Sequence, residues 1–165
     1  MLLHDARREA RYRDGELVLL GDQDRTRWDP VELAEGAASL GRARTLGGRG
    51  VYLLQAEIAS LHTADPRDWT AIAGRYDELS ALTGSPVVEL NRAVAVAEVA
   101  GPEAALVIVD GLDLGGYRYL HSTRADFLRR LGRNAEARAE YERALELAPS
   151  DAEREFLRRR LEEVS

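Results

Sequence analysis

Apolar residues recur every three or four positions along most of the chain, which is the spacing of one face of an α-helix. Four such faces lie between residues 51 and 113, and their members are Val51, Leu54, Ile58 and Leu61; Trp69, Ile72, Ala73, Tyr76 and Leu79; Val87, Leu90, Val94 and Ala97; and Ala105, Leu106, Val109 and Leu112. The pattern predicts helices at about 1–12, 30–46, 51–63, 66–83, 86–100, 102–113, 117–131, 134–148 and 151–164. Residues 14–29 break the periodicity, and we expect an extended, ordered connection there.

Prolines and capping residues support these boundaries. A proline at the first position of a helix loses no intrahelical hydrogen bond, and the residue before it can cap the helix. Four prolines have this arrangement: Pro30, Pro66, Pro86 and Pro102 follow Asp29, Asp65, Ser85 and Gly101. Two capping boxes, each with a glutamate three residues after the cap, are predicted at Asp29–Glu32 and Ser150–Glu153.

The stretch from Arg118 to Pro149 has the pattern of a tetratricopeptide repeat (TPR), a helical hairpin of roughly 34 residues. Small, aromatic and proline residues occupy the positions that this repeat prefers, namely Ala125, Gly132, Ala137, Tyr141, Ala144 and Pro149. Small residues let two helices approach closely, and Gly132 is expected in the turn between them. Two positions depart from the pattern, because His121 stands where an aromatic residue is usual and Arg124 where leucine is usual.

Consecutive helices pair into three hairpins over residues 51–148, and the helix at 150–164 would cap the last of them. We therefore predict an all-α fold, a TPR-like right-handed solenoid of helical hairpins with a short irregular N-terminal segment. Residues 1–46 would pack on the first hairpin rather than repeat it. A chain of 165 residues fits a single domain, which we expect to span 1–165.

Composition narrows the function classes. With 45% hydrophobic and 32% charged residues, the chain is typical of soluble globular proteins, and it has no apolar run of about 20 residues and no signal-peptide pattern. We expect a cytoplasmic location. The formal net charge of −6 disfavours nucleic-acid binding by the chain as a whole. Because cysteine is absent, disulfides and thiolate metal sites are excluded.

The densest polar group is Asp22-Gln23-Asp24-Arg25, followed closely by Trp28. Two carboxylates in a loop can bind a divalent cation, but the glycine and spacing of a calcium loop are missing. We favour a structural interpretation, in which Asp and Arg side chains tie the irregular segment to the helices and Trp28 anchors it in the core. No metal-ligand spacing, phosphate-binding loop or nucleophile motif is found, so we predict no enzyme activity, metal or cofactor.

Two further features are candidates for binding. Arginines cluster near the N-terminus, at Arg7, Arg8, Arg11 and Arg13, but acidic residues intervene, and we favour an exposed mixed-charge surface that could face a preceding domain. Asn91 and Arg92 stand beside the apolar stripe of their helix. They could line a concave face and bind a carboxylate or phosphate, or they could bond to a neighbouring helix end or to Asp24; we favour the structural role.

Several stretches together resemble one family. They are, in order, MLLHDARREAR (1–11), GELVLL with GDQDRTRWD (15–29), YLLQAEIASLH (52–62), DWTAIAGRYDEL (68–79), SPVVELNRAVAVAE (85–98) and the hairpin at 118–149. This series is similar to the C-terminal extension of extracytoplasmic-function (ECF) RNA polymerase sigma factors that carry a TPR-like domain. The most specific parts are HDARR, DQDR with Trp28-Asp29, and SPVVELNRAVA.

The resemblance implies a regulatory or supporting role toward sigma activity, in place of a separate anti-sigma factor. Promoter and core-polymerase binding in such sigma factors lie in helical regions before the extension, so this chain is not expected to bind promoter DNA alone. Its partners would be the sigma regions or other polymerase components, with no membrane contact. Residues expected to organise the contact are Asp22, Asp24, Arg25, Trp28, Asn91 and Arg92. The alternatives are a sensor for a small anionic ligand and a stand-alone TPR scaffold.

Overall fold

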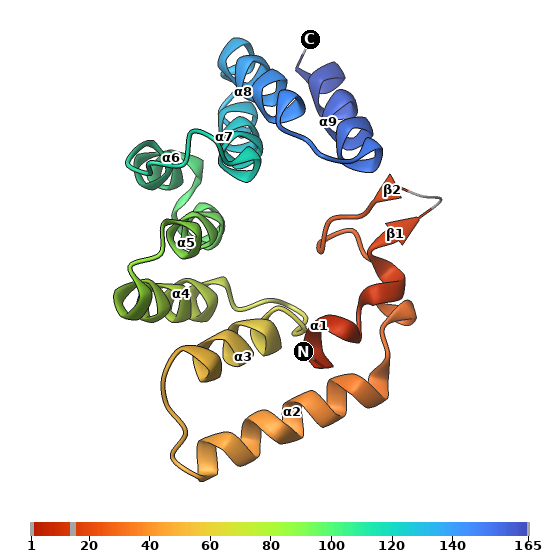
Figure 1. Cartoon of the computed structure of the whole chain (residues 1–165), viewed down its shortest axis with the longest axis vertical. Coiled ribbons are helices and arrows are strands. Elements are labelled where there is room, and N and C mark those ends of the chain that lie inside the picture. The colour runs from red at the N-terminus through yellow and green to blue at the C-terminus, as the bar shows by residue number, and fades with distance from the viewer. Residues whose placement is uncertain (1, 14–15, 165) are drawn as a thin grey trace. The chain divides into compact units, whose positions relative to one another are not determined.

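The computed structural model describes residues 2–13 and 16–164, and these form nine α-helices, two short 3-10 helices and one two-stranded hairpin (Figure 1). The predicted all-α class with helical hairpins is confirmed. The predicted helix at 1–12 and the extended segment at 14–29 are followed only from Leu2 and Glu16, because Met1, Asp14, Gly15 and Ser165 lie outside the described residues. The chain divides into two compact units, residues 1–84 and 85–165, each of which is described by itself.

The first unit begins with short elements and ends with three longer helices. In order they are α1 (Leu2–Asp5), the 3-10 helix η1 (Arg8–Ala10), β1 (Tyr12–Arg13), β2 (Glu16–Leu17), the 3-10 helix η2 (Arg25–Arg27), α2 (Pro30–Thr45), α3 (Val51–Leu61) and α4 (Trp69–Thr83). Helix α1 packs on α2 and α3 pairs with α4. Gly36 permits the first of these contacts, since a Cβ at this position would lie 2.8 Å from the side chain of Leu3.

The prediction of one helix over residues 1–12 was wrong. Helix α1 ends at Asp5 because the Ala6 carbonyl accepts a hydrogen bond from the Asp29 amide (2.8 Å). In a continuous helix that carbonyl would accept from Ala10, whose amide instead bonds to Arg7 (3.1 Å). A tertiary bond thus replaces a local one and turns the chain at Ala6 and Arg7.

Two further boundaries differ from the prediction. Helix α4 begins at Trp69 rather than Pro66, because the side chain of Asp68, not of Asp65, accepts the capping bond, from Ala71 N (2.9 Å). Helix α6 ends at Asp110 rather than near residue 113. Directly after it, the amides of Gly111 and Leu112 form tight turns by bonding to the carbonyls of Ile108 and Val109. The cap at Asp29 forms as expected, with bonds from the amides of Val31 and Glu32.

A buried glutamate connects the three long helices of this unit. Glu57 on α3 is 7% exposed, and its two carboxylate oxygens pair with Arg44 of α2 (2.8 Å) and Arg75 of α4 (3.0 Å). Both arginines keep part of their surface in water. Glu57 is the buried member of these three side chains. The two ion pairs therefore compensate a carboxylate that would otherwise be buried without a partner.

Replacing Glu57 with alanine is expected to lower the free energy of unfolding by about 2 kcal/mol, since two charge-assisted hydrogen bonds are lost. The matched control is Glu78→Ala, which removes an exposed partner of the same Arg75 and should cost less than about 0.5 kcal/mol. Urea unfolding of the two variants measures the difference. Equal losses of unfolding free energy in the two variants would show that burial of Glu57 does not increase its contribution to stability.

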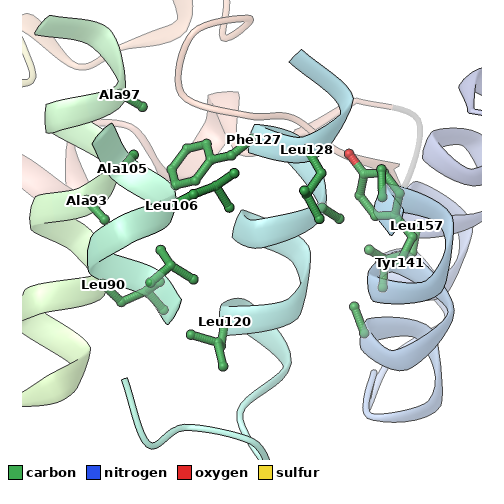
Figure 2. Packing of buried hydrophobic residues seen from close by; sticks show 14 of the residues in the cluster. Leu90, Ala93, Ala97, Ala105, Leu106, Leu120, Phe127, Leu128, Tyr141 and Leu157 are labelled. Atoms are coloured by element: carbon green, nitrogen blue, oxygen red, sulfur yellow. The ribbon is translucent and has the colours of Figure 1, made fainter. Parts of the chain in front are cut away.

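The second unit contains α5 (Pro86–Ala100), α6 (Pro102–Asp110), α7 (Arg118–Arg130), α8 (Asn134–Glu146) and α9 (Asp151–Glu163). Helix α5 pairs with α6, and α7 pairs with α8, which in turn contacts α9. Figure 2 shows Phe127 of α7 beside Leu106, and Leu128 on the side of α7 toward Tyr141. Fully buried alanines permit the close approach of these helices, namely Ala93, Ala105, Ala125, Ala137 and Ala144.

The TPR hairpin closes as its sequence indicates. Gly132 has φ 72°, a left-handed conformation that glycine adopts without strain, and the Arg133 amide bonds back to Leu128 O (2.9 Å). The two departures from the repeat pattern are polar ties. His121 bonds to Glu140 (2.7 Å) and to Gly115 O (3.0 Å), and Arg124 bonds to the same Glu140 (2.8 Å). These side chains join α7 to α8 and to the preceding loop.

Candidate interaction site

Trp28 lies at the centre of the irregular N-terminal segment. It is 5% exposed, and the guanidinium groups of Arg25 and Arg7 lie over its ring, 4.4 and 5.8 Å from the ring centroid. Such cation–π contacts add to the burial of the indole. Its Nε1 is buried without a hydrogen-bond partner. Trp28 therefore holds the segment through ring packing rather than through its polar atom.

The polar side chains of residues 22–25 have different roles. Arg25 donates to the carbonyls of Thr63 and Ala64 and so ties η2 to the α3–α4 loop. Asp24 does not pair with Arg25; it caps η2 by accepting from the amide (2.9 Å) and hydroxyl (2.7 Å) of Thr26, and these bonds lower the pKa of Asp24. Asp22 is exposed. Within residues 2–13 and 16–164, no three acidic or histidine side chains form a metal-binding group.

Arg7 and Arg67 both bond to the backbone of the N-terminal segment. Arg7 is 7% exposed; its Nε donates to Leu3 O (3.2 Å), and its Nη2 lies 3.2 Å from Nδ1 of His4. Arg67 donates to the carbonyls of Leu20 (3.1 Å) and His62 (3.3 Å). The acceptors here are backbone carbonyls and an imidazole, not carboxylates.

His62 follows α3, and its ring packs edge-on against Trp69, with 5.8 Å between ring centroids. Its Nδ1 is buried without a hydrogen-bond partner. Burial lowers the pKa of His62 to about 4, and the positive charges of Arg7, Arg67 and His4 contribute in the same direction. The imidazole is therefore neutral in the folded protein near pH 7.

Acidification should destabilise the protein through this group. The unfolded chain binds the proton of His62 near pH 6.5, whereas the folded chain resists it until about pH 4. The stabilisation from neutral His62 is thus complete above pH 6.5 and is lost progressively as the pH falls toward 4, by about 3 kcal/mol in all. Urea unfolding at several pH values should show a weaker dependence in His62→Gln. The control His121→Gln retains His62 and should keep the dependence; equal slopes in the two variants would contradict the assignment.

Asn91 and Arg92 lie on α5 in the second unit. Asn91 is exposed, and Arg92 is half-buried and donates from Nε to Glu89 on the same helix (2.9 Å). This carboxylate offsets the charge of Arg92. The arrangement therefore does not favour an anion site at Arg92.

Sequence reasoning missed the roles of Arg7, Glu57, His62 and Arg67. Arg7 belongs to the HDARR stretch that was singled out for its specificity, but nothing local distinguishes it from Arg8. Glu57 is the one charged residue in the stretch YLLQAEIASL, and that isolation was a usable signal of a buried ion pair.

The fold and these contacts define a TPR-like helical protein with an added N-terminal segment. The tetratricopeptide repeat model matches residues 118–151, and the model of a family of unknown function (DUF6596) matches residues 1–44. An uncharacterized protein of Rhizobium meliloti (strain 1021) is 41% identical over 172 residues. That alignment covers 100% of this chain and 41% of the relative, so the chain spans about two fifths of the relative's length. No solved structure matches. Over residues 2–13 and 16–164, there is no helix with the length and apolar character needed to span a membrane.

Proposed function

We propose that this chain is a regulatory protein-interaction domain of an ECF sigma factor and modulates sigma-dependent transcription initiation. TPR hairpins commonly serve protein–protein interaction, and the repeat at 118–151 supports that broader role. The sigma-factor assignment rests on the resemblance of the HDARR, DQDR–Trp28 and SPVVELNRAVA stretches. The match to part of a longer relative agrees with a domain that works beside other regions.

One observation carries the proposal: two of the stretches that give the resemblance fold onto each other. The Asp29 amide bonds to the Ala6 carbonyl (2.8 Å), and Arg7 and Arg25 both lie over Trp28. Such contacts give the segment a defined conformation. A defined segment with exposed side chains is suited to a specific protein contact, because little conformational entropy is lost on binding.

The contact surface is proposed on the exposed side of this segment, at Tyr12, Leu19 and Asp22. Tyr12 and Leu19 are exposed by 53% and 42% although both are large and apolar. Trp28, Asp24 and Arg25 hold the segment in place and are assigned an organising role. Asn91, exposed on α5, is proposed as a second contact, and Arg92 with Glu89 would fix its surroundings.

The test mixes the 165-residue chain with the promoter- and core-binding regions of a sigma factor of this family. Calorimetry should detect binding, and transcription from the cognate promoter should change when the chain is added. Tyr12→Ala and Leu19→Ala should each weaken binding about tenfold, whereas Tyr52→Ala, at an 88% exposed site in the same unit, should not. Absence of binding together with unchanged transcription would overturn the proposal.

A further inference from the structure

Arg7 is a buried cation that lacks the partner such groups usually have. Charged side chains this deeply buried are almost always paired with an opposite charge. Among the described residues, no carboxylate lies within ion-pair distance of Arg7, whose contacts are Leu3 O, the His4 ring and the face of Trp28. Carbonyl and ring dipoles offset only part of a full charge.

Two neighbouring arginines also lack a carboxylate partner among the described residues. Arg11 donates to His4 O (2.8 Å), and Arg67 donates to the carbonyls of Leu20 and His62. No ion pair joins either arginine to a carboxylate of the described residues. We call Arg7, Arg11 and Arg67, together with the adjoining neutral imidazole of His4, the cationic cluster.

The charges that act within the cationic cluster are almost all positive. Arg11 and Arg67 act on Arg7, and together with burial, the larger cause, they lower the pKa of Arg7. His4 is affected first by burial and then by Arg7 and Arg11, all of which lower its pKa, while Asp5 acts in the opposite direction. The charge of Asp5 thus reaches His4, but no ion pair or hydrogen bond joins this carboxylate to any of the four side chains.

Arg8 provides the contrast within the same short segment. It is exposed, and it pairs with Glu32 (3.3 Å) and Glu9 (3.9 Å). Glu32 and Glu9 therefore pair with an arginine that is already solvated by water. The buried Arg7 and its neighbours Arg11 and Arg67 keep charges that no ion pair with a described carboxylate neutralises.

We propose that the cationic cluster is a binding site for an oxyanion, that is, a carboxylate or phosphate group. Guanidinium groups are donors that such oxygens bind well, and a neutral imidazole can add one further N–H. His4 and Arg11 are exposed, so an anion can reach the cluster from solvent, and it would supply the charge that the described residues do not. The site is a property of the chain by itself and holds whether or not a sigma factor is the partner.

Thermal unfolding of the whole chain tests the site, with inorganic phosphate as the probe and sodium chloride at equal ionic strength as the reference. At about ten times Kd, phosphate should raise Tm by about 3–6 °C. Arg11→Gln should abolish most of this rise. Arg8→Gln, which removes a neighbouring arginine that has its own carboxylates, should keep it. General salt stabilisation would act equally on all three proteins, so equal rises would overturn the proposal.

The ring of His62 provides a second readout by NMR. Its pKa of about 4 reflects burial first and then Arg7, Arg67 and His4, so an anion bound to these cations should raise it. If neither phosphate nor a hexaglutamate peptide shifts the pKa of His62, the proposed site would also be overturned.

A hexaglutamate peptide distinguishes the source of the anion. Saturation at lower concentration by the peptide than by phosphate would identify carboxylates of an acidic protein segment as the occupant, and the reverse order would identify a small phosphate-like ligand. If neither probe gives a rise that depends on Arg11, the cluster binds no oxyanion.

Discussion

Replacing Phe127 with alanine is expected to lower the free energy of unfolding by about 3–5 kcal/mol, the range for deleting a buried aromatic ring. Phe127 is 2% exposed and lies beside Leu106 in the core of the second unit (Figure 2). Several neighbours there are alanines, whose single methyl groups cannot move into the vacated space. A residual cavity is therefore expected, and it adds to the lost burial of the ring.

Phe156 offers a matched control, because it is the second of the two phenylalanines and packs only partly against the same core. Phe156→Ala should cost about half as much or less. Urea unfolding followed by circular dichroism measures both variants. A loss at Phe127 no larger than that at Phe156 would mean that the core relaxes around the deletion.

Replacing Trp28 with alanine is expected to cost about 3–5 kcal/mol as well, here in the first unit. The indole is 5% exposed, and its loss would also leave Arg7 and Arg25 without the ring over which they lie. Arg7 is the more affected of the two, since it is buried and has no ion pair. Removing a favourable neighbour of a buried charge adds to the cost of the cavity.

The variant Trp28→Phe distinguishes the contribution of aromatic packing from that of the indole nitrogen. Because Nε1 has no hydrogen-bond partner, the phenyl ring keeps most of the packing, and a loss of about 1–2 kcal/mol is expected. Tyr52→Ala, at an 88% exposed position, should change stability by less than about 0.5 kcal/mol. Urea unfolding ranks the three variants. If Trp28→Phe were as damaging as Trp28→Ala, the indole nitrogen would have to make a contact that this structure lacks.

Much of the helical architecture could be predicted because its determinants are local. The spacing of apolar residues, the cap at Asp29 and the turn at Gly132 all act within a few residues, and each is present as expected. The boundaries failed where two local signals competed or a distant group intervened. Asp68 displaced Asp65 as the cap of α4, and the bond from Asp29 to Ala6 ended α1 early.

The candidate site could be predicted only in part. Trp28 was expected in the core and lies there, and Arg25 ties its segment to the helices as anticipated. Asp24 serves a local cap instead, because its Oδ1 accepts hydrogen bonds from the amide (2.9 Å) and hydroxyl (2.7 Å) of Thr26, two residues further along the chain. The right-handed superhelix, the single-domain organisation and the role of the six candidate residues in a partner contact stay predictions.

Local sequence was thus sufficient for the helices, their caps and the TPR hairpin, since periodicity and capping concern groups only a few residues apart. Packing determined which arginines of the N-terminal segment have carboxylate partners. Arg7 and Arg8 are adjacent and chemically identical, yet one is buried beside Trp28 without a carboxylate and the other is exposed and pairs with Glu32. That difference arises because segments far apart in the chain meet, and the distance between their charges depends on the three-dimensional fold rather than on spacing along the sequence.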